Sequence, residues 1–86
     1  MDLQQIREYF GEDRFATEAA GAVIEEAEDG YARCSMLLAK IHRNARGAVM
    51  GGAIFTLADF AFAVASNCAG IGVVTLTGQI SYLGTA

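Results

Sequence analysis

The segment Gly51-Gly-Ala-Ile-Phe-Thr-Leu-Ala-Asp-Phe-Ala-Phe-Ala-Val-Ala-Ser-Asn67 decides the fold of this chain. Apart from Asp59 it is apolar on almost every face of a helix, and such a helix is enclosed either by protein or by lipid. Gly70 and Gly72 follow the segment and are typical of a helix end. We therefore expect a central helix over about 51–68, with the rest of the chain wrapped around it.

Asp59 is the single charged residue between Gly47 and Ala86. A carboxylate in apolar surroundings is costly to desolvate unless it is paired, hydrogen-bonded or protonated. The alternative is a solvent-facing helical Asp, which is common. However, Thr56 and Ala63 share the stripe of Asp59 while the neighbouring positions are apolar. This pattern favours a buried carboxylate with a catalytic or ligand-contacting role.

The remaining segments predict one short helix and three strands. Apolar residues at helical spacing indicate an N-terminal helix over 2–11. Strands are expected over 22–28 and 31–41, joined by an Asp-Gly hairpin turn. Clean alternation over 73–83 predicts a third strand after the central helix. The fold class is therefore α+β, an antiparallel sheet wrapped around a long helix in one domain, residues 1–86.

Composition limits the function classes. The chain is 53% hydrophobic, without proline or tryptophan, so we expect another subunit to cover apolar surface. Its net charge is −4, with six basic residues scattered among ten acidic ones, which argues against nucleic-acid binding. Cys34 and Cys68 do not have metal-ligand spacing, and the N-terminus lacks a signal peptide pattern. These features predict reduced thiols in a cytoplasmic protein with no metal.

A membrane span is an alternative for the apolar half of the chain. Residues 48–76 are long enough to cross a bilayer, since about 20 apolar residues suffice. Asp59 near the centre and Asn67 are both unfavourable in lipid. The glycines after Asn67 and the β-branched residues that follow them indicate a helix end and a strand. We therefore expect no membrane partner.

The two glycines at the start of the central helix offer backbone N–H groups at its positive end. Such groups bind anions or a developing oxyanion, although an ordinary glycine turn is the alternative. Asp59 lies eight residues after Gly51, about 12 Å along the helix axis. The two groups are too far apart to act on one carbonyl. A two-fold dimer with antiparallel helices would bring Asp59 of one copy to Gly51 of the other.

One motif makes a family resemblance visible. It reads His42-x-Asn44-x-x-Gly47-x-x-Met50-Gly51-Gly52-x-x-Phe55-x-Leu57-Ala58-Asp59. The chain closely resembles the hotdog-fold thioesterases of the phenylacetic-acid-degradation type, whose usual pattern has a histidine, two glycines and then Leu-Ala-Asp. The resemblance extends over residues 15–83.

This resemblance implies dimers or dimers of dimers that hydrolyse small or aromatic acyl-CoA thioesters at the subunit interface, with no cofactor. By the same resemblance, Asp59 is the general base or nucleophile, and the N–H of Gly51 polarises the thioester carbonyl. Asn44 positions the carbonyl or the water. Thr75 supplies a hydroxyl that assists the attacking water, although a plain strand threonine is the alternative.

The sequence departs from the family pattern at two places. Met50 replaces the motif histidine, and its thioether cannot donate a hydrogen bond. We expect Met50 to line the acyl pocket, with the N–H of Gly52 also facing the substrate. Arg46 is a candidate for contact with a CoA phosphate, with a solvated loop arginine as the alternative. The chain also stops at Ala86, where family members continue with more strands of the same sheet.

A second function class remains open on these residues: a non-catalytic acyl-CoA-binding or structural hotdog module. Met50 and the missing strands favour it. The retained Asp59, together with Gly51 and Asn44, favours the enzyme.

Overall fold

The computed structural model describes residues 1–70 and 72–84. Its regular elements follow the chain in an α+β order. They are helix α1 (Leu3–Phe10), a π-helical turn (Phe15–Ala19), strands β1 (Ala22–Glu28) and β2 (Tyr31–Met36), a 3-10 turn (Lys40–His42) and helix α2 (Gly51–Asn67). The predicted terminal and central helices are therefore present, with boundaries close to those expected.

Helix α1 begins at a capping box and presents two core side chains. The Asp2 carboxylate accepts the N–H of Gln5 at 2.9 Å, and the Gln5 side chain accepts the N–H of Asp2 at 3.0 Å. This exchange satisfies two of the N–H groups that a helix start leaves unpaired. Ile6 and Phe10, one turn apart, are buried. The polar face of the helix is left to solvent.

Strands β1 and β2 form an antiparallel hairpin around Gly30, which has a φ of 78° that suits glycine. The strand expected over 31–41 ends at Met36, opposite Ala22 where β1 begins. Residues 37–39 therefore have no partner strand among the described residues. A 3-10 turn follows at Lys40–His42 in place of the last part of the expected strand.

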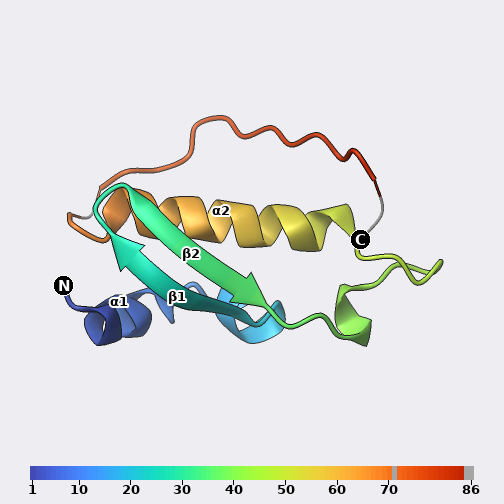
Figure 1. Cartoon of the computed structure of the whole chain (residues 1–86), viewed down its shortest axis with the longest axis horizontal. Coiled ribbons are helices and arrows are strands. Elements are labelled where there is room, and N and C mark those ends of the chain that lie inside the picture. The colour runs from blue at the N-terminus through green and yellow to red at the C-terminus, as the bar shows by residue number, and fades with distance from the viewer. Residues whose placement is uncertain (71, 85–86) are drawn as a thin grey trace.

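Helix α2 packs across the hairpin, with α1 beside it (Figure 1). Phe60 and Val64 on one face of α2, and Cys68 just after its end, are buried in one cluster with residues of β1 and α1. The rings of Phe60 and Phe10 meet edge to face, with centroids 6.4 Å apart. Because apolar burial is the main stabilising term in a domain of this size, these contacts fix the orientation of α2.

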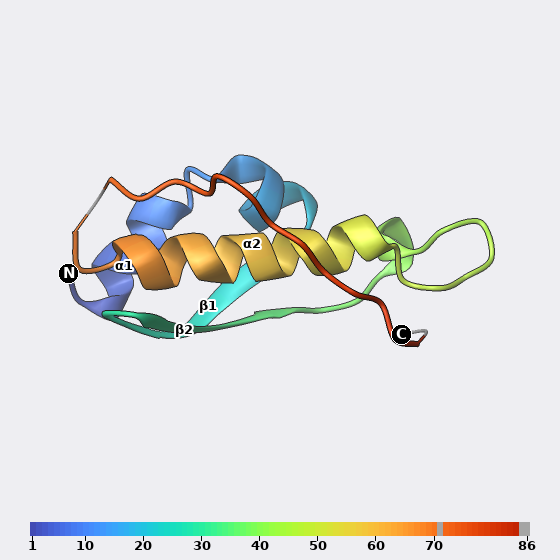
Figure 2. The same cartoon turned by 90° about the horizontal axis from the view of Figure 1, so that it is seen from above.

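The third strand predicted over 73–83 is wrong. Residues 72–84 form an extended segment without strand pairing, which we call the tail. The tail runs along α2 on the side away from the hairpin (Figures 1 and 2), so no strand edge lies beside it. A strand needs a hydrogen-bonded neighbour, and the tail has none within the described chain. Its leucines at 76 and 83 are each 97% exposed.

No helix in the described part of the chain has the length and apolar character needed to cross a membrane.

Candidate functional site

Asp59 is exposed, which corrects the prediction of a buried carboxylate. The two-stranded hairpin is too narrow to wrap α2, so it covers the face that carries Phe60 and Val64 and leaves the stripe of Asp59 open. The carboxylate is hydrated and pays no burial cost in this arrangement. Exposure alone therefore gives no argument for a functional role of Asp59, and the argument depends on the groups beside it.

Thr75, on the tail, lies beside Asp59. The Thr75 hydroxyl oxygen is 3.5 Å from Asp59 Oδ1, which is longer than a good O–H···O hydrogen bond. These two predicted catalytic residues are 16 positions apart in sequence. The tail brings them together even though it is not a strand.

Two cavities adjoin Asp59. The one beneath the tail has a volume of about 290 Å³, and its lining includes Phe55, Phe62 and Ile80 together with Asp59 and Thr75. Since Phe55 and Phe62 lie four residues before and three residues after Asp59, all three share one helix face. The lining of this cavity contains no charged side chain other than Asp59.

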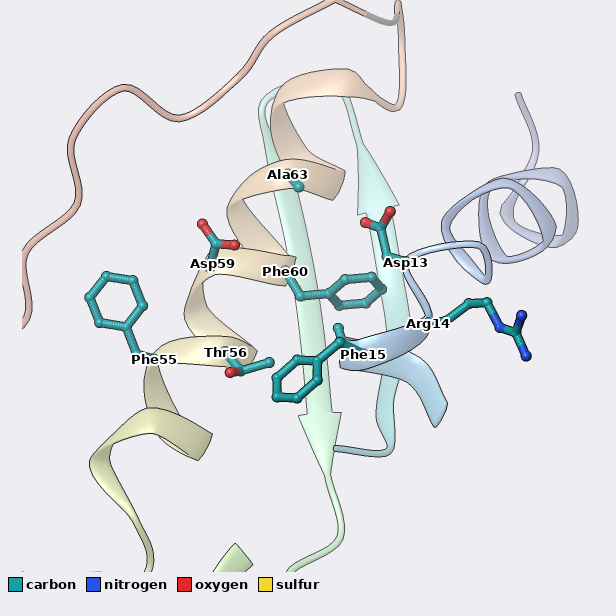
Figure 3. Close-up of a pocket in the computed structure, with 9 residues that line it drawn as sticks. Asp13, Arg14, Phe15, Phe55, Thr56, Asp59, Phe60 and Ala63 are labelled. Carbon is teal, nitrogen blue, oxygen red and sulfur yellow. The ribbon is translucent and has the colours of Figure 1, made fainter. Parts of the chain in front are cut away.

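The second cavity, of about 480 Å³, lies between α2 and the π-helical turn (Figure 3). Phe60 of α2 and Phe15 of the π-helical turn both project between the two elements, and Asp59 also lines the cavity from α2 with its carboxylate directed away from the two rings. Arg14 also lines this cavity, but Figure 3 shows its guanidinium directed away from Asp59. The Arg14 guanidinium instead pairs with the Glu18 carboxylate at 3.0 Å, an exposed contact between adjacent turns. Asp59 is thus not neutralised by this arginine.

The start of α2 has no side-chain cap. Met50 occupies the N-cap position, and its side chain accepts no hydrogen bond from the helix. Within residues 1–70 and 72–84, neither the N–H of Gly51 nor that of Gly52 has an acceptor. These are the groups that a ligand oxygen can occupy at a helix start.

Tyr82 covers Gly51 from the tail. Its hydroxyl donates to the Gly51 carbonyl at 2.7 Å. A Cβ at position 51 would lie 2.9 Å from the Tyr82 ring, closer than real Cβ contacts. Glycine at this position therefore permits the close approach of the tail to the helix start.

Asn44 organises the loop that leads into α2. Its side-chain oxygen accepts the N–H groups of Arg46 at 3.0 Å and Ala48 at 3.1 Å. This oxygen is therefore occupied by the loop itself, and the Nδ2 group is the part of Asn44 that remains for a ligand. Arg46 is exposed on the same loop.

Five of the predicted site residues fall into two groups in one chain, and Asn44 and Arg46 lie on the loop before α2. Asp59 and Thr75 meet near the middle of α2, whereas Met50, Gly51 and Gly52 stand at its start. Eight residues separate Gly51 from Asp59, or about 12 Å of helix. A single copy therefore does not bring the carboxylate and the N–H donors to one carbonyl.

Two buried polar residues were not predicted to organise the site. His42 and Asn67 are each 6% exposed and fully hydrogen-bonded. Asn67 holds the tail, since its Oδ1 accepts the N–H groups of Gly72 at 2.9 Å and Val73 at 2.8 Å. The sequence offered a signal for each: His42 is the single histidine, and Asn67 interrupts an apolar run. Neither signal specified the bonding partners.

Among the described residues, no group of three or more His, Cys, Asp or Glu side chains is arranged to hold a metal ion.

Comparison with known proteins gives one informative likeness. The chain is 36% identical over 84 residues to a protein of Archaeoglobus fulgidus described as "Putative esterase". The match covers 98% of this chain and 54% of that protein, so the chain spans about half the length of this relative. No family model and no solved structure matches the chain.

Proposed function

We propose that this chain is a subunit of a hotdog-type hydrolase that cleaves the thioester of a small or aromatic acyl-CoA. The observation that carries the proposal is the presence of Asp59 and Thr75 together in the lining of an apolar, aromatic-walled cavity. The family resemblance of the motif around Asp59 supports it. The likeness to a protein described as an esterase agrees with ester or thioester hydrolysis.

In the proposed reaction Asp59 acts as general base. Its carboxylate takes a proton from a water molecule, which attacks the thioester carbonyl carbon, and the Thr75 hydroxyl orients that water. The carbonyl oxygen becomes an oxyanion and accepts hydrogen bonds from backbone N–H groups at the start of α2. The C–S bond then breaks, and the Asp59 proton passes to the departing sulfur. The products are a free acid and the CoA thiol.

The proposed site needs two copies of the chain. The open N–H groups of Gly51 and Gly52 lie two helical turns from Asp59 in one copy. Pairing two α2 helices antiparallel across a two-fold axis would place Asp59 of one beside Gly51 of the other, twice per dimer. The proposed partner is therefore a second copy, in a dimer or a dimer of dimers. Such an interface would require the Tyr82 contact with Gly51 to open, while Thr75 stays beside Asp59.

The aromatic-walled cavity supports the proposed acyl class. Phe55 and Phe62 flank Asp59, and the volume of about 290 Å³ is just below the usual range for ligand sites, which suits a small acyl group. An aromatic acyl group can lie against these rings in offset or edge-to-face contact. Met50 and Gly52 instead line a separate cavity of about 400 Å³ at the start of α2. In the paired arrangement this cavity would belong to the same shared site.

A non-catalytic acyl-CoA-binding module is the second candidate. Met50 favours it, because a thioether cannot donate the hydrogen bond that a histidine supplies. The long 3.5 Å approach of Thr75 to Asp59 also favours it, since a water-orienting hydroxyl is expected at hydrogen-bond distance. Both candidates bind acyl-CoA, so only a hydrolysis assay separates them.

The test compares Asp59→Asn with wild type on a panel of benzoyl-, phenylacetyl- and short alkanoyl-CoA, following release of the thiol. We expect Asp59→Asn to lower kcat by at least about 100-fold, the lower range for loss of general base catalysis. Its affinity for a non-hydrolysable CoA thioether analogue should be retained. Asp13→Asn is the matched control, because Asp13 is an exposed Asp on the neighbouring cavity wall. Equal hydrolysis by wild type and Asp59→Asn would exclude Asp59 as the base.

A further inference from the structure

His42 forms a buried junction that the proposed chemistry does not use directly. Its Nε2 lies 2.6 Å from the carbonyl oxygen of Ala20, at the end of the π-helical turn. Its Nδ1 accepts the N–H of Ala39 at 2.9 Å. The ring thus joins two segments that are 22 residues apart in sequence.

These two contacts specify the tautomer of the ring. A carbonyl oxygen can only accept, so Nε2 carries the proton, and a backbone N–H can only donate, so Nδ1 does not. If Nδ1 carried a hydrogen, that hydrogen would point at the hydrogen of the Ala39 N–H, and the bond between the two nitrogens would be lost. The junction therefore requires the neutral Nε2–H form.

The backbone of His42 extends this junction to helix α2. Its carbonyl accepts the N–H of Met50 at 2.8 Å, and the Met50 carbonyl accepts the N–H groups of Ala53 at 3.0 Å and Ile54 at 3.3 Å. Met50 has no side-chain cap of its own. The hydrogen bond from the Met50 N–H to the His42 carbonyl consequently sets the orientation of the first turn of α2.

We infer that His42 is a positioning residue, which holds the Gly51 and Gly52 N–H groups in a fixed direction relative to the π-helical turn. Its importance for hydrolysis rests on the proposed function, in which these groups stabilise the oxyanion. The lining of the 400 Å³ cavity agrees, since it includes His42, Ala20 and Gly52 together. A displacement of about 1 Å at such donors can lower a rate by about 100-fold.

The competing explanation is that His42 only fills space. A phenylalanine at position 42 fills similar space but leaves the Ala39 N–H and the Ala20 carbonyl without partners. A glutamine can replace the donor to Ala20 and offers an acceptor on the same amide. His42→Phe and His42→Gln therefore separate packing from hydrogen bonding.

The experiment uses NMR on the untagged chain, in which His42 is the single histidine. We expect the imidazole nitrogens of the wild type to show a protonated Nε2 and a bare Nδ1. We expect His42→Phe to shift the Gly51 and Gly52 amide signals and accelerate their hydrogen exchange, and His42→Gln to keep both near wild type. For hydrolysis, His42→Phe should lower kcat by about 10- to 100-fold with KM unchanged, with partial recovery in His42→Gln.

An Nδ1–H tautomer in the wild type would overturn the inference. Gly51 and Gly52 amide signals at their wild-type positions in folded His42→Phe would also overturn it. The same holds if these amide signals move away from their wild-type positions in folded His42→Gln. If His42→Phe does not fold, the tautomer of the wild-type ring and the amide spectrum of His42→Gln test the positioning role. Absence of any wild-type hydrolysis would remove the proposed function alone, because the amide signals still test the positioning role.

Discussion

Residue types at two positions of α2 define the proposed chemistry, and both residues are predictions from the sequence. Asp59 and Gly51 were predicted from charge pattern, glycine placement and motif. Their exposure was not predictable in the same way. It depends on how much of α2 the hairpin covers, and helix periodicity reports apolar faces without saying what covers them.

The pair Gly51→Pro and Gly51→Ala isolates the Gly51 N–H, because both variants add a Cβ beside Tyr82 and only proline removes the N–H. Proline is tolerated at the first helical position, and Met50 already has the extended conformation that precedes proline, with φ −63° and ψ 136°. Gly51→Ala is the matched control, because it keeps the N–H but adds a Cβ against Tyr82. We expect Gly51→Pro to lower kcat by about 100-fold relative to Gly51→Ala, as for the loss of an oxyanion donor. Equal kcat values in the two variants would exclude the Gly51 N–H from the mechanism.

Glu26 gives the hairpin a pH-dependent contribution to stability. The Arg33 guanidinium and, to a lesser extent, the Tyr31 hydroxyl hold the pKa of Glu26 below its ordinary value through hydrogen bonds of 3.2 and 2.9 Å. A lowered folded-state pKa stabilises the fold above the unfolded pKa, near 4.3, and this contribution is lost as pH falls through the folded pKa.

We therefore expect Glu26→Gln to lower Tm slightly at pH 7, with the difference from wild type shrinking below about pH 4. Thermal melts followed by circular dichroism at several pH values measure it, with Glu12→Gln as a control outside the hairpin. A Tm difference that stays constant from pH 7 to pH 3 would contradict this origin.

At the scale of elements, the sequence predicted the helices and the hairpin but not the tail. Helix α1 and strand β1 are specified locally, by a capping box and by alternation that ends in an Asp-Gly turn. The alternation over 73–83 also favours a strand, but strand formation needs an edge to pair with. Both edges of the hairpin lie on the other side of α2, which no local pattern could reveal.

Asn67 is the residue that joins the tail to α2. Its Nδ2 donates to the carbonyls of Ala63 at 2.9 Å and Val73 at 3.0 Å, in addition to the two bonds accepted by its Oδ1. Replacing it with alanine removes four part-buried hydrogen bonds to the backbone of α2 and the tail. We expect Asn67→Ala to lower the free energy of unfolding by about 1–3 kcal/mol. Ser66→Ala, one residue earlier, is the control.

Urea denaturation measures the Asn67→Ala loss, and hydrogen exchange at Val73 reports whether the tail is released. Unfolding free energies that agree within 0.5 kcal/mol for the two variants, about the scatter of ordinary surface substitutions, would contradict the role of Asn67.

For the whole molecule, the described chain leaves large apolar side chains exposed on several elements. Phe15, Leu37 and Ile41 are 72%, 89% and 71% exposed, in addition to the leucines of the tail. Exposed apolar surface on this scale is typical of a chain that associates. This agrees with a proposed site that is divided between two copies.

The most direct test of the shared site mixes two inactive variants. Asp59→Asn and Gly51→Pro are unfolded together, refolded as an equal mixture and assayed for thioester hydrolysis, with light scattering and native mass spectrometry to count mixed dimers. With random pairing, half of the dimers contain one copy of each variant. Each of these dimers has one native site out of two, so we expect about a quarter of wild-type activity. Mixed dimers that form without any recovery of activity would contradict a site built from Asp59 of one copy and Gly51 of the other.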